Sequence, residues 1–208
     1  MRLHGYFRSS ASWRVRIALR YKGWTVEQTS YQLRRQEQRL AGYLRLNPQG
    51  LVPTLELDNG THLTQSFAIC EYLEEVRPAP PLLPADPVLR AKVRAFALVI
   101  ACDVHPLQNL KILARLRQLG LDEEAVTGWA RKTIEEGLDA CEALAGEGPF
   151  CFGDTPTLAD VFLVPQLANG RRFGVEPRWP RLLEAERASL ALEAFAAAAP
   201  GNQPDAEP

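Results

Sequence analysis

Hydrophobic and polar positions first form a clear pattern between residues 3 and 23. A short apolar segment is followed by serines and then by apolar residues at helical spacing. The helical positions make two apolar faces, one of Val15, Ala18 and Leu19 and the other of Trp13, Ile17 and Tyr21. Two apolar faces predict a helix that is mostly buried, with Arg16 and Arg20 on the remaining side and Gly23 well placed to end it.

The remainder of the first 76 residues alternates between strand-like and helix-like segments. Strands are expected at 25–33, 51–57 and 61–64, and helices at 34–46 and 65–76. Turn sequences separate them, with Asn47-Pro48-Gln49-Gly50 as one turn and Asp58-Asn59-Gly60 as a hairpin turn. Together with the opening strand and helix, the order βαβαββα is that of a thioredoxin-like domain.

Composition changes sharply after this part of the chain. Five prolines fall within the eleven residues from Arg77 to Pro87, and neither a helix nor a central strand tolerates such a run. We interpret the run as an extended linker at a domain boundary. The predicted parts are an α/β thioredoxin-like domain over 1–77, a linker over 78–87 and an all-α domain over 88–208.

Beyond the linker, the convincing patterns are helical. Helices are expected over 89–104, 107–119, 122–145 and 182–199, and residues 201–208 are expected to form a loose tail. Another helix is expected to begin at Thr157, because Asp160 three residues later can complete a capping box. Pro165 lies inside that helix and should bend it.

Composition and charge exclude several classes of function. With 46% apolar and 24% charged residues the composition is that of an ordinary globular protein, and the net charge of -1 gives no reason to expect nucleic acid or an anionic membrane as partner. The longest useful apolar run, 95–102, is far shorter than the roughly 20 residues of a transmembrane helix. The N-terminal residues lack the apolar core of a signal peptide.

Cysteine usage bears on the cellular compartment and on metal binding. Four cysteines, Cys70, Cys102, Cys141 and Cys151, fit no metal-binding or redox spacing and lie in apolar sequence surroundings. They predict reduced core thiols in a cytoplasmic protein that needs no metal.

Candidate chemistry first appears where the serines meet the first helix. Ser9, Ser10 and Ser12 crowd a helix N-terminus, where backbone N–H groups and the helix dipole favour an anion. Serine is also a common N-terminal cap, so the residues alone leave open whether they bind a ligand or only begin the helix. Gln65-Ser66, at the start of a later helix, leaves the same two alternatives open.

The serine segment resembles a known family signature. The run Ser-Ser-x-Ser-Trp-Arg-Val-Arg-Ile-Ala-Leu, beginning at Ser9, is similar to that of the zeta-class glutathione transferases, the maleylacetoacetate and maleylpyruvate isomerases. Further matches are Asn-Pro-Gln-Gly-Leu-Val-Pro, Gln-Ser, the proline linker, His-Pro-Leu-Gln-Asn, the capping box and Arg-Arg-Phe. The third position of the run is often Cys in this class and is Ala11 here, so a sulfur nucleophile at this place would have to come from glutathione.

The resemblance implies a glutathione site. Ser9 and Ser10 would stabilise the glutathione thiolate, and the residues alone do not tell which of them donates the hydrogen bond. Contacts to the rest of glutathione would come from Gln38, Val52, Pro53, Gln65, Ser66, Asp103, His105 and Asn109. The Val52-Pro53 peptide is expected to be cis, and Asp103 is expected to reach the glutathione of a partner subunit in a homodimer.

The resemblance also implies a substrate and a reaction. Arg8 and Arg172 would bind the carboxylates of a maleyl keto acid, because the planar guanidinium matches a carboxylate at two points. Addition and loss of the thiolate would turn the cis double bond into the trans bond of the fumaryl isomer and regenerate glutathione. Such a step belongs to the breakdown of tyrosine or other aromatic compounds, and the sequence does not choose between maleylpyruvate and maleylacetoacetate.

Two other functions stay open at this point. A general glutathione conjugase or dehalogenase would use the same thiolate site with an apolar acceptor pocket, and would not need the two arginines. A binding protein without catalytic activity would not need the thiolate site, so the intact set of Ser9, Ser10, Val52-Pro53 and Gln65-Ser66 argues against it.

Overall fold

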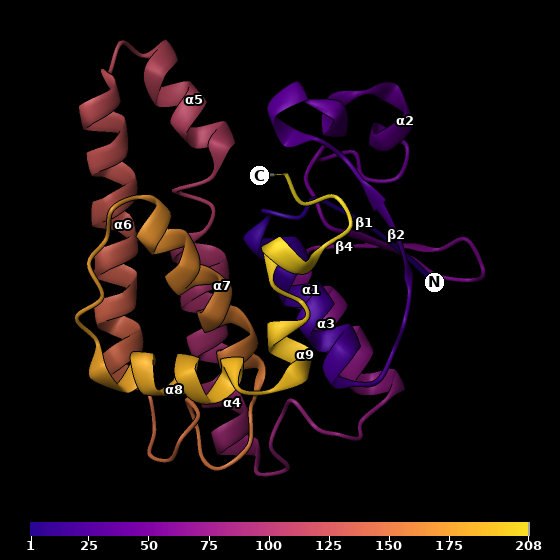
Figure 1. The fold of residues 1–208 in the computed structure, drawn as a ribbon, viewed down its shortest axis with the longest axis vertical. Coiled ribbons are helices and arrows are strands. Elements are labelled where there is room, and N and C mark those ends of the chain that lie inside the picture. Colours follow the sequence, from indigo (N-terminus) through magenta and orange to yellow (C-terminus); the bar gives the residue numbers. More distant parts are fainter. Residues whose placement is uncertain (208) are drawn as a thin grey trace. The chain divides into compact units, whose positions relative to one another are not determined.

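The computed structural model describes residues 1–207, and Figure 1 shows their helices and strands. The chain divides into two compact units, one of Met1–Leu82 with Ala191–Pro208 and the other of Leu83–Leu190. The division differs from the predicted domain boundaries chiefly at the C-terminus, which was assigned to the helical domain and groups with the first unit. The chain therefore leaves the first unit after Leu82 and returns to it at Ala191.

A four-stranded sheet in the order β2-β1-β3-β4 forms the frame of the first unit. The strands are β1 (Arg2–Gly5), β2 (Glu27–Ser30), β3 (Thr54–Glu56) and β4 (His62–Thr64). β1 is parallel to β2 and antiparallel to β3, and β3 is antiparallel to β4. The predicted thioredoxin-like order of strands and helices is confirmed.

Helices α1 (Ser10–Tyr21) and α3 (Ser66–Val76) pack against each other in this unit (Figure 1). Residues Ser10 to Leu19 of α1 are all buried, as the two apolar faces predict. The buried residues include Arg14 and Arg16, which are only 1% and 3% exposed. A buried guanidinium needs hydrogen bonds to replace those of water, and Arg16 donates to the carbonyl oxygens of Phe7 at 2.9 Å and Ala198 at 3.0 Å.

The segment 34–46 does not form the single short helix that was expected. It folds as two 3-10 turns, Leu33–Arg35 and Glu37–Arg39, followed by the one-turn helix α2 (Ala41–Leu44). Gln36 separates the two turns with a left-handed backbone, at φ 57°. Only Tyr43 in these elements is buried, so the segment lacks the apolar stripe that stabilises a longer helix.

The second unit is helical. Its elements are α4 (Pro87–Leu98), the π-helix Val99–Val104, α5 (Leu110–Gln118), α6 (Glu123–Leu144), α7 (Leu158–Arg172) and α8 (Pro180–Leu190). Helix α7 packs against α4, α6 and α8 (Figure 1). It is buried along nearly its whole length. The predicted capping box of Thr157 and Asp160 begins this helix, and Pro165 lies inside it.

The end of the chain differs from prediction. In place of one helix over 182–199, α8 ends at Leu190 and a separate short helix, α9 (Glu193–Ala196), packs on α1 in the first unit. A 3-10 turn, Pro200–Asn202, follows. Gln203, Asp205 and Glu207 make specific hydrogen bonds within the first unit, so the prediction of a loose tail is wrong for this part of the chain. Residue 208, also part of the predicted tail, lies outside the described residues.

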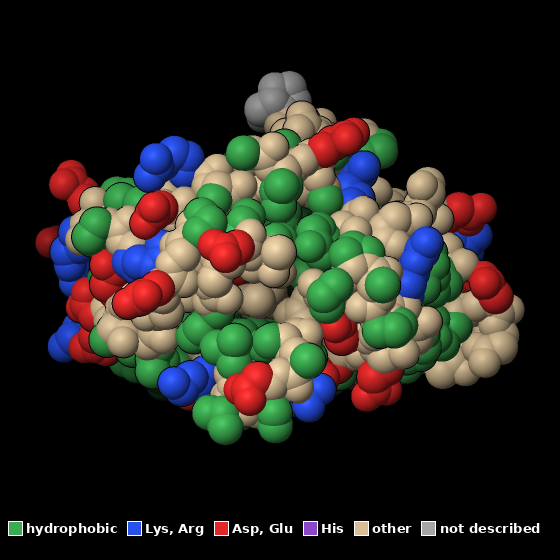
Figure 2. All heavy atoms as spheres, turned by 90° about the horizontal axis from the view of Figure 1, so that it is seen from below, with side chains coloured by type: hydrophobic (Ala, Val, Ile, Leu, Met, Phe, Trp, Pro, Cys, Tyr) green, Lys and Arg blue, Asp and Glu red, His purple; other side chains and the backbone are tan. Residues whose placement is uncertain are grey.

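Surface charge is mixed, and Figure 2 shows acidic and basic side chains interspersed over one face. Within the described part of the chain, no helix combines the length and the apolar composition needed to cross a bilayer.

Candidate active site

The N-terminus of α1 carries the serine cluster. Ser9 is the N-cap, with an extended backbone and a hydroxyl oxygen that accepts from the Ser12 N–H at 3.2 Å. Capping uses only an acceptor lone pair, so the Ser9 hydroxyl hydrogen stays available for donation. Ser9 is partly exposed, whereas Ser10 is only 5% exposed. Ser9 therefore caps α1 and can still donate its hydroxyl hydrogen to a ligand.

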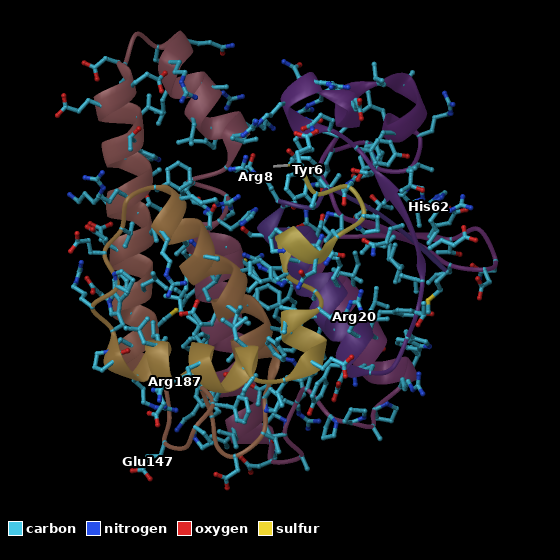
Figure 3. The ribbon with its side chains drawn as sticks, in the orientation of Figure 1. Tyr6, Arg8, Arg20, His62, Glu147 and Arg187 are labelled. Carbon is cyan, nitrogen blue, oxygen red and sulfur yellow. The ribbon has the colours of Figure 1, made fainter. Side chains whose placement is uncertain are left out.

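The loop between β1 and α1 holds Arg8 next to these serines. Figure 3 labels Arg8 and Tyr6 close together at this loop. The Tyr6 ring packs edge-on against Phe7 at 4.8 Å between centroids. The Tyr6 hydroxyl is buried and makes no hydrogen bond to any described residue. Arg8 itself is partly exposed.

The Val52-Pro53 peptide is cis, as expected, and lies just before β3. A second cis peptide, Ala79-Pro80, lies in the linker and was not predicted. Neither the N–H nor the C=O of Val52 hydrogen-bonds to another described residue. Val52 is partly exposed, so both groups can pair with the backbone of an extended ligand.

The start of α3 forms a second candidate anion site. Gln65 has a positive φ of 67°, which is rare for a residue other than glycine, and its side chain does not cap the helix. Its amide donates instead to Gln49 Oε1 at 2.8 Å. Ser66 is buried, and its hydroxyl accepts from the Arg14 guanidinium at 3.4 Å. The N-terminus of α3 favours an anion such as a carboxylate at this place.

Arg14 was not among the predicted site residues. Its position within the signature run was the only signal, because a sequence pattern does not reveal that Arg14 lies beside Ser66, 52 residues further along the chain.

Gln38 adds a buried acceptor in the first unit. Its side-chain oxygen, Oε1, is buried and has no hydrogen-bond partner among the described residues. A buried acceptor of this kind is costly unless a ligand or water satisfies it. The first unit therefore contains a hydroxyl donor at Ser9 and an anion site at the start of α3, together with backbone groups at Val52 and an acceptor at Gln38 that have no partner among the described residues. This set suits a short thiol-containing peptide with a free carboxylate.

The other predicted glutathione residues, Asp103, His105 and Asn109, lie in the second unit around the end of the π-helix. Asp103 is exposed and His105 is half-buried. Asn109 is the N-cap of α5, and its Oδ1 accepts from the Lys111 N–H at 3.0 Å. Its amide nitrogen is the part that capping leaves for a ligand.

A chain of side-chain amides holds Arg172 at the end of α7. Arg172 donates to Asn169 Oδ1, and Asn169 Nδ2 donates in turn to Gln108 Oε1. Gln108 and Asn169 are buried while Arg172 is exposed, so a buried amide pair orients an accessible guanidinium. Neither amide was predicted, although both stand in segments that match the family.

The neighbouring Arg171 is different. Both of its terminal nitrogens donate to the Glu186 carboxylate at 2.5 Å, and this hydrogen-bonded ion pair raises the pKa of the Arg171 guanidinium. Its charge is compensated by Glu186, which makes Arg171 a structural residue of the α7–α8 contact.

The cysteines do not supply a reactive thiolate near the serines. Burial raises the pKa of Cys70 and of Cys141 to about 12, and burial also raises the pKa of Cys151. All four cysteines are free. Cys102 is exposed, so the prediction that all four are core thiols is wrong for this one.

Comparison with known proteins identifies relatives along the whole chain. The glutathione S-transferase N-terminal domain matches residues 8–76, and the glutathione S-transferase C-terminal domain matches residues 113–184. The chain is 49% identical to a maleylacetoacetate isomerase of Pseudomonas aeruginosa, over 99% of this chain and 98% of the relative.

Two solved structures extend the similarity to the fold. One is the holo structure of a maleyl pyruvate isomerase, described as a bacterial glutathione S-transferase of the zeta class, with TM-score 0.96, 44% identity and complete coverage of both chains. The other is a maleylacetoacetate isomerase from Anaeromyxobacter dehalogenans 2CP-1 with bound dicarboxyethyl glutathione and citrate. It has TM-score 0.89 and 43% identity, and the match covers 100% of this chain and 97% of that one.

Proposed function

Because the chain belongs to the glutathione S-transferase family, we propose that it is a glutathione-dependent cis–trans isomerase that converts a maleyl keto acid to its fumaryl isomer. The substrate is maleylpyruvate or maleylacetoacetate. The observation that carries the proposal is the Ser9-capped N-terminus of the buried helix α1, in a chain that places no cysteine in this segment. Glutathione, when bound, supplies the thiolate that adds to the substrate double bond and leaves it again.

Ser9 is the proposed donor to that thiolate. It keeps its hydroxyl hydrogen while it caps the helix, and it is more accessible than the buried Ser10. The first N–H groups of α1 add their dipole to the same place, and both effects lower the pKa of a nearby thiol. Ser10 is the first residue of α1, and its backbone N–H is one of these N–H groups.

The remaining groups of the first unit hold the peptide part of glutathione. Val52 pairs its backbone N–H and C=O with the cysteinyl residue, and Pro53 follows it. Gln65 and Ser66 bind the γ-glutamyl carboxylate at the start of α3, with the Arg14 guanidinium 3.4 Å from the Ser66 hydroxyl. Gln38 accepts from a ligand N–H with its orphan oxygen. In the second unit, His105 and Asn109 are proposed to contact the same cofactor.

Arg8 and Arg172 bind the substrate carboxylates. Arginine suits this task because its charge persists at every working pH and its fork accepts a carboxylate at two points. Positive charge held at the substrate also stabilises the negative charge that develops on its carbonyl oxygen during addition. Asn169 and Gln108 orient Arg172 for this role.

Assembly and location are part of the same proposal. We propose a homodimer in which Asp103, which is exposed in this chain, reaches the glutathione of the partner subunit. The four free cysteines agree with a cytoplasmic protein.

The test is the ultraviolet absorbance of maleylpyruvate and of maleylacetoacetate with the protein, with and without glutathione. Glutathione-dependent formation of the fumaryl isomer without consumption of glutathione is expected, and the two turnover rates identify the substrate. Binding of glutathione without conversion of either substrate would overturn the isomerase assignment and favour a conjugase or dehalogenase. Failure to bind glutathione would overturn the cofactor assignment as well.

A further inference from the structure

The last described residues of the chain are anchored by Gln203. Its side chain is 5% exposed, and its amide nitrogen donates to the carbonyl oxygens of Ala197 at 3.0 Å and Ala199 at 2.8 Å. The Gln28 amide donates to Gln203 Oε1 at 3.4 Å. These contacts direct the residues that follow toward β1 and β2 of the same unit.

Asp205 then contacts the loop that carries the serines. Its Oδ2 accepts from the backbone N–H of Phe7 at 3.0 Å and from the hydroxyl of Ser30 at the end of β2. Phe7 lies two residues before Ser9. A hydrogen bond from a backbone N–H to a carboxylate is charge-assisted and therefore stronger than one between neutral groups.

Arg16 contacts the carbonyl groups of the same loop. Its guanidinium donates to the carbonyl oxygens of Phe7 at 2.9 Å and Tyr6 at 3.4 Å, and to Ala198 at 3.0 Å. The Ser9 N–H also donates to the Tyr6 carbonyl, at 3.1 Å. Phe7 is thus held at its N–H by the C-terminal residues and at its C=O by α1, and Asp205 also interacts electrostatically with Arg16.

We propose that Asp205 is a positioning residue for Ser9 and Arg8, an inference that rests on the proposed function. Asp205 ties the loop to the C-terminal residues, so that the Ser9 hydroxyl is held where it can donate to the glutathione thiolate. A hydroxyl displaced by a fraction of an ångström stabilises the thiolate less well, and small misplacements of this kind are costly in catalysis.

A second acidic residue in the tail provides a matched control. Glu207 Oε1 accepts from the Gln32 side-chain amide at 2.6 Å, and this exposed contact does not involve the serine loop. Glu207→Gln removes one negative charge from the tail, as Asp205→Ala does, and leaves the hydrogen bond to Phe7 in place.

The experiment compares full-length wild type, D205A, D205N and E207Q with glutathione bound. The thiolate absorbance of bound glutathione is titrated against pH, glutathione affinity is measured by calorimetry, and kcat and KM are measured with the better maleyl substrate. D205A is expected to raise the pKa of the bound thiol and to lower kcat on the order of tenfold, with a smaller change in substrate KM. E207Q is expected to match wild type, and D205N to recover most of the activity because its amide oxygen still accepts from Phe7.

The outcomes separate this inference from the proposed function. A wild-type protein that turns over neither maleyl substrate contradicts the proposed function. Normal wild-type turnover with an unchanged thiol pKa in D205A overturns the role of Asp205 alone. If D205A does not fold, D205E replaces it, because the longer side chain moves the carboxylate while keeping its charge. An unchanged thiol pKa in D205E overturns the inference equally.

Discussion

Arg171 and Arg172 are neighbours in the sequence and have different tasks in the structure. The Glu186 carboxylate compensates the charge of Arg171. Arg172 donates to the side-chain oxygen of Asn169, which is buried and in turn donates through its amide nitrogen to Gln108. The ion pair commits Arg171 to the contact between α7 and α8, and Arg172 is the arginine of this pair that we propose for substrate binding.

Arg172→Ala is expected to raise KM for the maleyl substrate about 10- to 100-fold, because a hydrogen bond to a charged group contributes ~1.5–3 kcal/mol. KM for glutathione should change little. Steady-state kinetics with each component varied in turn checks this. Arg171→Ala is the control, and it should lower the melting temperature while leaving substrate KM near wild type. Equal effects of the two substitutions on substrate KM would contradict the assignment.

Asn169→Ala should act on substrate binding through Arg172. We expect a rise in substrate KM of roughly threefold to tenfold, since the guanidinium keeps its charge and loses only its orientation. The double variant with Arg172→Ala should be no worse than Arg172→Ala alone, because residues in one hydrogen-bonded network are not additive. Additive effects in this double-mutant cycle would show that Asn169 acts independently of Arg172.

Thiol reactivity follows burial of the four cysteines. Burial raises the pKa of Cys70 and Cys141 to about 12, so at pH 8 their thiolate fraction in the folded protein is negligible. The exposed Cys102 should react quickly with a thiol reagent under native conditions, and all four should react in denaturant. A Cys102→Ser variant that still reacts quickly would contradict this prediction.

Among the helices, N-termini differ in how much they depend on their caps. At α7 the buried Asp160 carboxylate accepts from the N–H groups of Cys151 and Thr157, both at 2.8 Å. At α6 the exposed Asp122 caps with one hydrogen bond to the Ala125 N–H, at 2.8 Å. The first carboxylate joins two segments of the second unit, while the second only begins a helix.

Asp160→Ala should therefore destabilise the protein more than Asp122→Ala. The exposed cap is expected to contribute ~1 kcal/mol, and loss of the buried carboxylate ~2–4 kcal/mol because buried N–H groups are left unsatisfied. Chemical denaturation monitored by circular dichroism measures both. Similar losses for the two variants would mean that burial does not strengthen the α7 cap.

At the scale of the whole molecule, the chain completes its first unit with its last residues. Ala191–Pro208 groups with Met1–Leu82, and α9 packs on α1. The proposed glutathione groups Ser9, Val52 and Ser66 all belong to this unit. Ligand binding should therefore stabilise a unit made from both ends of the chain.

Glutathione at about 100 times its Kd is expected to stabilise the folded protein by ~2.7 kcal/mol, by mass action. A rise in the thermal unfolding midpoint measures this. Cysteinylglycine is the control, since it keeps the thiol and lacks the γ-glutamyl carboxylate proposed to lie at Ser66. If cysteinylglycine stabilises the protein as well as glutathione at equal concentration, the start of α3 is not the carboxylate site.

Local patterns in the sequence by themselves determined much of this protein. The two apolar faces of α1, the serines before it, the hairpin turn and the Thr157 capping box each depend on residues within a few positions of one another. The spacing of apolar residues predicts which face of a helix or strand is buried. The residue types just before a helix predict its cap. The order of strands and helices, and with it the thioredoxin-like fold, could therefore be predicted from the sequence.

Contacts between distant residues were decided only by the tertiary structure. Arg14 beside Ser66, Asn169 on Gln108 and Asp205 on Phe7 join residues separated by 52, 61 and 198 positions. None of these contacts could be predicted from the sequence, because the partner of a polar side chain is fixed only when packing brings the two within hydrogen-bonding distance. The expected helix over 182–199 is divided and the expected loose tail is ordered for the same reason. Helix α9 packs on α1, and Gln203 and Asp205 hydrogen-bond to Gln28 and Phe7, contacts with distant residues that no local pattern predicts.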